Sequence, residues 1–205
     1  MSSIDNHIIN DKINYVGIIR FNQQCHNWLS HKYICNITID NIKYNSVEQY
    51  LIFKKAELFN DERIMKAVMI AMDPLDMHYL GRRIENYVDE DWVKIRGEVS
   101  YIGNKHKFLQ NPDLYKKLFE TKFNKLIYYA DDLVWGCNPD DKGENLLGKT
   151  IMRVRENDML SMTNIYFYNK YNDFAACEKS KYIVNEDDYN FCEMNNIDFF
   201  IKYIV

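Results

Sequence analysis

Signals for the start of an α-helix recur through the middle of this chain, and they restrict its fold more than any other feature of the sequence. Ser46 is a suitable N-cap for a helix over residues 47–59, where apolar side chains recur at helical spacing. Asp61 is a suitable cap for a second helix through Met72, which must end before Pro74 because a residue that precedes proline avoids the α conformation. Two helices are therefore expected in this stretch.

Three more helices are expected further along the chain. Carboxylates at Asp89 and the next two positions stabilise the positive end of a helix dipole, which favours a helix over residues 89–109. Pro112 fits the first turn of a helix that runs to Glu120. A last helix is expected over residues 145–156, so the chain is built mainly from helices.

Segments typical of strands are short and few. Residues 13–22 and 33–44 are rich in β-branched and aromatic side chains, and Asp40 and Asn41 supply a turn within the second segment. A further short strand is expected over residues 126–129. The combination predicts an α+β fold, a helix-rich single domain with a small antiparallel sheet.

The composition is that of a globular protein. The 205 residues are 47% hydrophobic and 27% charged, which is ordinary for a folded domain. No apolar run approaches the roughly 20 residues that a membrane span requires. The N-terminus has no basic segment followed by an apolar stretch. We therefore expect a soluble, cytoplasmic or nuclear protein that is not secreted and has no membrane partner.

Cysteine and histidine residues show no spacing typical of metal ligands. The five Cys include no CxxC pair, and the five His form no HExxH motif. We expect no disulfide framework and no metal, and the sequence calls for no other cofactor.

Charge divides the chain into two parts. The net charge is −4, and acidic residues are concentrated after residue 155, whereas the preceding part is nearly neutral. A nearly neutral body does not bind nucleic acid through bulk electrostatics, so any nucleic acid must be bound at a local site. The acidic segment 158–205 is rich in Tyr and Phe, too aromatic for a disordered tail. We expect a domain over residues 1–157 and an ordered extension over residues 158–205 that packs on it.

Glu48 is the first candidate for chemistry. It lies in the first turn of the helix expected after Ser46, and Lys55 follows on the same helix face, about 10.5 Å along the axis. The alternative is an acid that complements the helix dipole and a solvated lysine. The spacing alone favours that alternative.

The richest polar stretch is the loop over residues 132–148. Trp135 and Gly136 combine an aromatic plane with backbone that a flat ligand can approach, and Gly143 and Gly148 lie at a helix start, where amide groups bind anions. No GxxxxGK[ST] pattern fits this loop, so it is not a P-loop. From composition alone, a core tryptophan beside a tight turn is the better interpretation.

Seven motifs follow one another in a fixed order between residues 13 and 157. They are Tyr44-Asn45-Ser46-Val47-Glu48-Gln49-Tyr50, Lys55-Ala56 with Phe59-Asn60-Asp61, Leu80-Gly81-Arg82, Trp92 with Arg96, the run from Gly103 to Pro112, Asp132-x-x-Trp135-Gly136, and the run from Gly143 to Lys149 with Met152 and Arg155. Each motif is weak by itself, but in this order they resemble the NADAR (YbiA-like) family. Residues 158–205 carry no such resemblance.

The resemblance implies an N-glycosidase domain, a metal-independent hydrolase that cleaves the N-glycosidic bond of an ADP-ribosyl or ribosyl-phosphate substrate. Members of the family hydrolyse phosphoribosylamino intermediates of riboflavin synthesis or remove ADP-ribose from guanine in DNA. The implied partner is therefore an ADP-ribose-like or ribosyl-phosphate small molecule, or ADP-ribosylated nucleic acid.

The resemblance also assigns roles to residues. Glu48 matches the family's proposed catalytic acidic residue, and Asp132 matches an invariant pocket position, so both are expected to be catalytic. The expected substrate-binding residues are Lys55, Arg82, Trp92, Trp135, Gly136 and Asn145.

These residue types suit the implied reaction. Cleavage of a C1′–N bond builds positive charge on the ribose, which a carboxylate such as Glu48 stabilises while it accepts a proton from the attacking water. Trp135 can stack on a base, and Lys55 or Arg82 can bind a phosphate through charge-assisted hydrogen bonds.

Alternatives remain open at several positions. Trp92 fits a core residue at a helix start as well as a pocket residue, and Asp132 also fits a turn. Bacterial members carry Asp where this chain has Cys137, and an amide where it has Ile52, which leaves the substrate open. The alternative function is a module that binds ADP-ribose or a nucleotide without cleaving it.

Overall fold

The computed structural model describes residue 15 and residues 17–121 and 124–160. Most of the extension expected over residues 158–205 lies outside this part, so its packing on the domain stays a prediction. The first residue of the extension, Asp158, accepts a hydrogen bond from the Tyr101 hydroxyl at 2.6 Å and forms an ion pair with Lys105 at 2.6 Å. No helix within the described ranges is long and apolar enough to cross a membrane.

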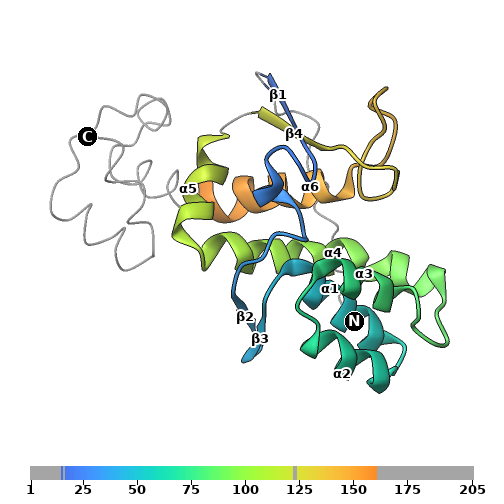
Figure 1. Ribbon diagram of the computed structural model, residues 1–205. Helices are drawn as coiled ribbons and strands as arrows, with labels where there is room; N and C mark the ends of the chain where they lie inside the picture. Colours follow the sequence, from blue (N-terminus) through green and yellow to red (C-terminus); the bar gives the residue numbers. More distant parts are fainter. Residues whose placement is uncertain (1–14, 16, 122–123, 161–205) are drawn as a thin grey trace, which may run out of the picture.

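The fold is helix-rich α+β, as the sequence predicts (Figure 1). The α-helices of the described residues are α1 Val47–Leu58, α2 Glu62–Ile70, α3 Pro74–Gly81, α4 Asp89–Leu109, α5 Pro112–Glu120 and α6 Leu146–Arg153. A 3-10 turn spans Asn27–Leu29, and π-helical residues Val154–Leu160 continue α6. Four short strands, β1 Gly17–Phe21, β2 Ile37–Ile39, β3 Ile42–Tyr44 and β4 Asn124–Tyr128, complete the described part.

The predicted N-caps hold the first two helices in place. The Ser46 hydroxyl accepts a hydrogen bond from the Gln49 amide at 3.1 Å at the start of α1. The Asp61 carboxylate accepts one from the Ile64 amide at 3.0 Å at the start of α2. Each cap binds an amide that the first helical turn leaves without a partner, so these starts are fixed by local sequence.

The strands form two pairs. β2 and β3 pair antiparallel, and the turn residues Asp40 and Asn41 both have positive φ angles of 51° and 64°, which suits the tight turn of a twisted hairpin. This hairpin confirms the small antiparallel sheet. β1 and β4 pair in parallel, in a register that matches Gly17 with Asn124 and Phe21 with Tyr128. Local patterns did not predict this second pair, because its strands lie about a hundred residues apart in the chain.

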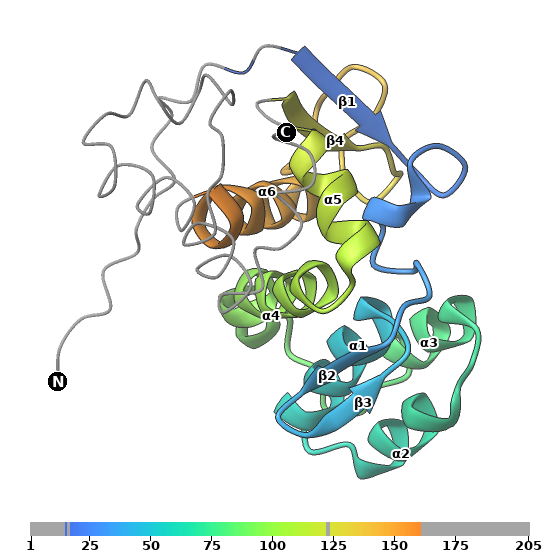
Figure 2. The ribbon, with the colours of Figure 1, turned by 90° about the vertical axis from the view of Figure 1, so that its left-hand side faces the viewer.

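Helix α4 separates the two halves of the domain (Figures 1 and 2). It contacts α1 on one side and α5 and α6 on the other, and α6 lies against β4. The half below α4 in Figure 1 contains α1, α2, α3 and the β2–β3 hairpin, and the other half contains β1, β4, α5 and α6. The segment between β1 and β2 joins one half to the other.

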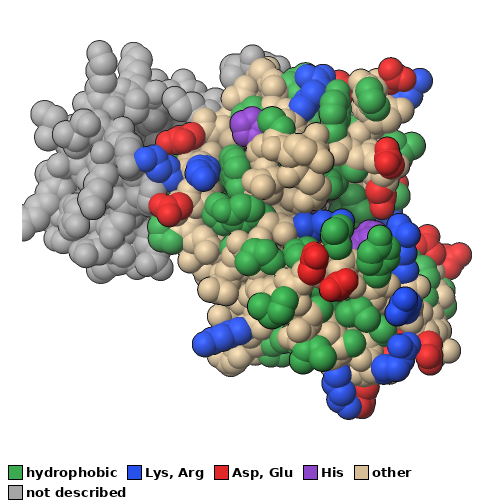
Figure 3. All heavy atoms as spheres, viewed as in Figure 1, with side chains coloured by type: hydrophobic (Ala, Val, Ile, Leu, Met, Phe, Trp, Pro, Cys, Tyr) green, Lys and Arg blue, Asp and Glu red, His purple; other side chains and the backbone are tan. Residues whose placement is uncertain are grey.

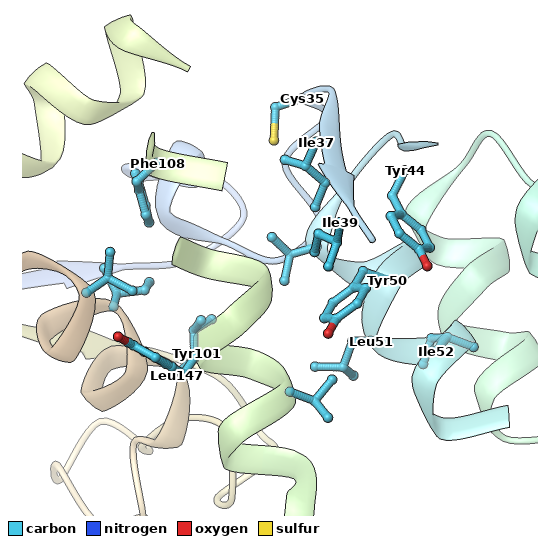
Figure 4. Packing of buried hydrophobic residues seen from close by; sticks show 14 of the residues in the cluster. Cys35, Ile37, Ile39, Tyr44, Tyr50, Leu51, Ile52, Tyr101, Phe108 and Leu147 are labelled. Atoms are coloured by element: carbon cyan, nitrogen blue, oxygen red, sulfur yellow. The ribbon is translucent and has the colours of Figure 1, made fainter. Parts of the chain in front are cut away.

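The core lies along α4 (Figure 4). Tyr50 and Leu51 of α1 point toward α4 and are buried, as are Phe108 of α4 and Leu147 of α6. The close approach of α1 depends on Gly103, where a Cβ atom would lie 2.8 Å from the Val47 side chain. Removal of this apolar surface from water is the main term that holds the halves together.

The structure corrects the sequence-based prediction for residues 71–83. The second helix ends before Pro74, as expected, but at Ile70 rather than Met72, and Pro74 begins a helix that the sequence analysis missed, α3. The Asp73 carboxylate accepts a hydrogen bond from the Leu75 amide at 2.8 Å, so Asp73 and Pro74 form a helix start in which proline fits the first turn. This missed helix carries part of the site.

Candidate active site

A cleft of about 560 Å³ opens between the two halves of the domain. On the face in Figure 3, acidic, basic and histidine side chains gather between the upper and lower halves. The residues that line the cleft are Ser30, His31, Lys32, Glu48, Leu51, Ile52, Lys55, His78, Gly81, Arg82, Tyr87, Asp89, Trp92, Arg96, Tyr128, Asp131, Asp132, Val134, Trp135 and Leu147. A mixture of aromatic planes and charges in a concave site is typical of a pocket for a small polar ligand.

Glu48 lies in the first turn of α1 at the cleft wall. Its backbone amide donates a hydrogen bond to the His31 carbonyl at 3.0 Å, which ties the start of α1 to the preceding loop. The side chain is only 8% exposed, and its Oε1 atom lies 3.3 Å from Nδ1 of His78 on α3. The carboxylate is thus fixed in place, largely shielded from bulk water, and in contact with the cleft.

Lys55 lies two turns further along the same face of α1. Its Nζ atom donates a hydrogen bond to the Gly81 carbonyl at 3.2 Å and lies 4.1 Å from the centre of the Tyr87 ring and 6.0 Å from that of Trp92. Burial lowers the pKa of Lys55, and the nearby Asp89 carboxylate opposes that shift. Among the described residues, no carboxylate forms an ion pair with it, so this cation is available to an anionic ligand.

Two arginines line the cleft beside Lys55. Arg82 follows the last residue of α3, is exposed, and forms no ion pair within the described part of the chain. Arg96 of α4 forms an ion pair with Glu144 at 3.4 Å. Trp92, at the start of α4, is buried in the core and also lines the cleft, so both interpretations of this residue hold.

The loop before α6 brings Asp132 and Trp135 to the cleft. The Asp132 carboxylate accepts hydrogen bonds from the amides of Val134 at 3.0 Å and Trp135 at 3.3 Å, so Asp132 both lines the cleft and shapes the loop. Trp135 is half-buried, with its ring edge-on to His31 at a centroid distance of 5.2 Å. The loop therefore presents an aromatic plane in a defined orientation.

His31 supports Trp135 from within the core. The imidazole is buried, with Nε2 3.0 Å from the Ser100 hydroxyl and 3.2 Å from the Asn104 amide nitrogen. Burial, together with the charges of Lys107 and Lys32, lowers the pKa of His31 to about 3. The ring is neutral at physiological pH and acts as a fixed polar wall.

The structure brings six of the eight predicted site residues together. Glu48, Lys55, Arg82, Trp92, Asp132 and Trp135 all line the cleft. Gly136 and Asn145 are not among the lining residues. A Cβ atom at Gly136 would lie 2.6 Å from the Tyr128 carbonyl, so glycine serves close packing there. The Asn145 side chain bonds to β4 instead, accepting from the Tyr128 amide at 3.0 Å and donating to the Leu126 carbonyl at 2.8 Å.

The start of α6 does not offer the anion site that its glycines indicate. The amides of Asn145, Leu146 and Leu147 donate to the carbonyls of Gly136, Val134 and Trp135, respectively. These first amides of the helix are therefore used to hold the loop against the helix rather than left free for a ligand.

The cleft residues that sequence reasoning missed include His31, His78, Tyr87 and Tyr128. None belongs to a motif with metal-ligand or nucleophile spacing. His78 lies on the missed helix α3, and the Asp73-Pro74 start would have placed it one turn before Arg82. His31, Tyr87 and Tyr128 reach the cleft through contacts with residues distant in sequence, which the spacing of residues along the chain does not predict. Among the described residues, no three His, Cys, Asp or Glu side chains are grouped as metal ligands.

The fold and the cleft define the protein as a helix-rich α+β domain with a polar and aromatic cleft that contains one shielded carboxylate and several cations. The chain belongs to the NADAR domain family, which matches residues 20–157. This match confirms the resemblance drawn from the seven motifs.

Curated relatives extend the comparison. An N-glycosidase of Acanthamoeba polyphaga mimivirus is 40% identical over 127 residues, which cover 56% of this chain and 74% of the relative. A riboflavin biosynthesis protein of Vibrio vulnificus is 34% identical over 132 residues, which cover 64% of this chain but 35% of that longer protein. The solved NMR structure of the E. coli protein YbiA matches with a TM-score of 0.64 at 24% identity and covers 73% of this chain and 89% of that chain. The last similarity concerns the fold alone.

Proposed function

We propose that the chain is an N-glycosidase that hydrolyses the bond between ribose C1′ and nitrogen in an ADP-ribosyl or ribosyl-phosphate substrate. The observation that carries the proposal is that the shielded Glu48 carboxylate and the Lys55 cation lie on one face of α1. Both side chains line the same cleft. The names of the mimivirus and Vibrio relatives, an N-glycosidase and a riboflavin biosynthesis protein, support the same reaction type.

Glu48 supplies the electrostatic part of the reaction. As the C1′–N bond breaks, its electron pair leaves with the nitrogen and positive charge builds on the ribose ring. A carboxylate in a site that excludes bulk water stabilises that charge more strongly than it would in water. Water then adds its oxygen to C1′ and transfers a proton to Glu48, while the departing nitrogen takes up a proton from solvent; Glu48 afterwards releases its proton to solvent.

The remaining residues orient the substrate. Lys55 and Arg82 lie where a phosphate group would form charge-assisted hydrogen bonds, and Trp135 offers a face for a base or sugar ring. Asp132 lies beside Trp135 in the same loop, where its free carboxylate lone pairs can accept a hydrogen bond from a ribose hydroxyl. The residues of the cleft thus divide into a phosphate side and a sugar side.

Two departures from the bacterial pattern differ in their place in the structure. Cys137 is buried, pairs through its backbone with Tyr128 and Ala130, and does not line the cleft. Ile52 does line the cleft and adds apolar surface between Glu48 and Lys55. The change at Cys137 therefore leaves the cleft carboxylates intact, whereas Ile52 alters the shape of the site and hence the choice of substrate.

Turnover of a panel of substrates tests the proposal. The panel contains DNA that carries ADP-ribosylated guanine and a phosphoribosylamino pyrimidine, since a flipped base or a free metabolite fits a local cleft of this size. Glu48→Gln is expected to lower kcat at least about a hundredfold and to leave the affinity for ADP-ribose nearly unchanged. The control is Glu57→Gln, which changes an exposed carboxylate near the end of the same helix.

The alternative is a module that binds ADP-ribose without cleaving it. That function predicts no hydrolysis of any panel member by the unaltered protein, together with ADP-ribose affinity that is equal in the unaltered protein and in Glu48→Gln. Such a result would overturn the enzymatic proposal.

A further inference from the structure

We infer that His78 is a positioning residue for Glu48. The imidazole of His78 holds the Oε1 atom of Glu48, so that the Oε2 atom of Glu48 is available to the substrate. The inference rests on the proposed function, because it concerns how the same carboxylate is prepared for the reaction. His78 lies on α3, and neither the motifs nor the family resemblance assigned this residue to the site.

The contact between the two side chains is direct. Nδ1 of His78 lies 3.3 Å from Oε1 of Glu48, and the His78 side chain is 37% exposed where the Glu48 side chain is 8% exposed. Within the described residues, Oε2 has no hydrogen-bond or ion-pair partner. A carboxylate held through one oxygen cannot rotate freely, so the second oxygen keeps one direction.

Helix α3 is fastened to α1 on both sides of His78. Before it, the buried Met77 sulfur accepts a hydrogen bond from the Ser46 hydroxyl, with the two atoms 3.6 Å apart. After it, the Gly81 carbonyl accepts from Lys55 Nζ at 3.2 Å. These contacts bind α3 to the N-cap of α1 and to its third turn, so the His78 backbone lies between two fixed points.

Gly81 permits close packing between α3 and α1. A Cβ atom at this position would lie 2.5 Å from Cδ1 of Ile52, which is one helical turn after Glu48. The absence of a side chain lets α3 approach α1 closely enough for the imidazole to reach the carboxylate. The 3.3 Å separation is longer than the roughly 2.8 Å typical of a charge-assisted hydrogen bond, and such contacts commonly shorten when substrate fills a site.

His78 takes no part in the bond changes of the reaction and only orients Glu48. The attacking water gives its proton to Glu48, and the electron pair of the C1′–N bond leaves with the nitrogen, so His78 neither gains nor loses a covalent bond. Its Nδ1–H group donates to Oε1 throughout. Loss of that donor lets the carboxylate turn, which lowers kcat while the contacts that bind the phosphate stay in place.

Two amide substitutions separate positioning from packing. In His78→Asn the side-chain nitrogen takes the place of Nδ1, whereas in His78→Gln it takes the place of Nε2 and the longer side chain fills more of the ring volume. We expect His78→Asn to keep kcat within about threefold and His78→Gln and His78→Ala to lower it at least about tenfold, with KM nearly unchanged. The control His106→Asn alters a histidine on α4 that is outside the cleft and is expected to leave kcat unchanged.

The opposite order overturns the inference. If His78→Gln is as active as the unaltered protein, or more active than His78→Asn, the imidazole only fills space. A kcat in His78→Ala equal to that of the unaltered protein has the same consequence.

A second measurement is independent of turnover. With ¹⁵N-labelled histidine, at a pH where the ring is neutral, the carboxylate partner requires the proton on Nδ1, the less common tautomer of free histidine. The His78 signals are assigned by their loss in His78→Asn. An Nε2–H tautomer overturns the inference even if the enzyme is active, whereas an Nδ1–H tautomer in a protein without turnover supports the pair and overturns only the proposed function.

Discussion

The Nζ atom of Lys55 lies 4.1 Å from the centre of the Tyr87 ring. The ring attracts the cation through its negative face, but it supplies no counter-charge. Burial lowers the pKa of Lys55, which shows that water has been partly removed from the ammonium group without full compensation. A phosphate group in the cleft would supply the missing negative charge.

Replacement of Lys55 by methionine tests this assignment. Lys55→Met keeps the aliphatic packing but removes the charge, and the dissociation constant for ADP-ribose is expected to rise about tenfold or more, since a hydrogen bond to a charged group contributes roughly 1.5–3 kcal/mol. Isothermal titration calorimetry measures the effect. Lys54→Met is the matched control, because the adjacent Lys54 pairs with Glu57 outside the cleft. Equal losses of affinity in the two variants would count against a phosphate contact.

Protonation of His31 is expected to destabilise the fold in acid. Burial lowers the pKa of this imidazole to about 3, from an ordinary value of about 6.5, so the unfolded chain binds a proton in this range that the folded chain does not. The free energy of unfolding therefore rises with pH across this window. The contribution of the neutral His31 ring to stability is lost as the pH falls through the same window. In His31→Gln this contribution disappears.

Urea denaturation at a series of pH values measures the difference. Between pH values of about 6.5 and 3, the unaltered protein is expected to lose up to about 1.4 kcal/mol per pH unit more than His31→Gln does. Above pH 6.5, roughly the ordinary histidine value, the difference between the two proteins should stay constant, because only packing then separates them. Parallel curves over the whole range would show that His31 is not the buried neutral group described above.

Local sequence determines the parts of the fold that short-range contacts stabilise. The Ser46 and Asp61 caps, the extents of α4 and α5, and the Asp40-Asn41 hairpin turn follow from residues within a few positions of one another. The sequence analysis missed helix α3 because proline can either follow the end of a helix or occupy its first turn. Here the Asp73 carboxylate caps the helix that Pro74 begins.

The candidate site divides in the same way. Glu48 and Lys55 share a face of one helix, which helical spacing predicts, and the loop from Asp132 to Trp135 is a continuous motif. His78 reaches Glu48 through the packing of α3 on α1, where Gly81 lies against Ile52. A contact of that kind depends on packing between helices, and no periodicity in the sequence reports it.

Asn145 is expected to contribute to stability rather than to ligand affinity. The residue has a positive φ angle of 51°, and its buried amide bonds to two backbone groups of β4. Asn145→Ala leaves both groups without partners and places alanine in a left-handed conformation, so the free energy of unfolding is expected to fall by about 2–4 kcal/mol. Urea denaturation measures it. Asn138→Ala, which removes hydrogen bonds to the exposed loop amides of Asp140 and Lys142, is the control and is expected to cost less than about 1 kcal/mol. Weaker ADP-ribose binding by a stably folded Asn145→Ala would instead favour a role in the cleft.

Trp135 is expected to supply stacking energy to the ligand. Its ring is half-buried, packs against His31 in a T-shaped arrangement and lines the cleft, so the indole can contact a ligand there. Stacking on an aromatic side chain contributes roughly 1–3 kcal/mol per base, so Trp135→Leu is expected to raise the dissociation constant for ADP-ribose about tenfold, and Trp135→Phe much less. Trp28→Leu is the control, since Trp28 packs edge-on against Phe108 and does not line the cleft. This variant should lose stability but keep its affinity for ADP-ribose.

A comparison of two ligands shows which group the indole contacts. If Trp135→Leu loses the same affinity for ADP-ribose and for ribose 5-phosphate, the indole contacts the sugar rather than the base, because only ADP-ribose carries a base to stack.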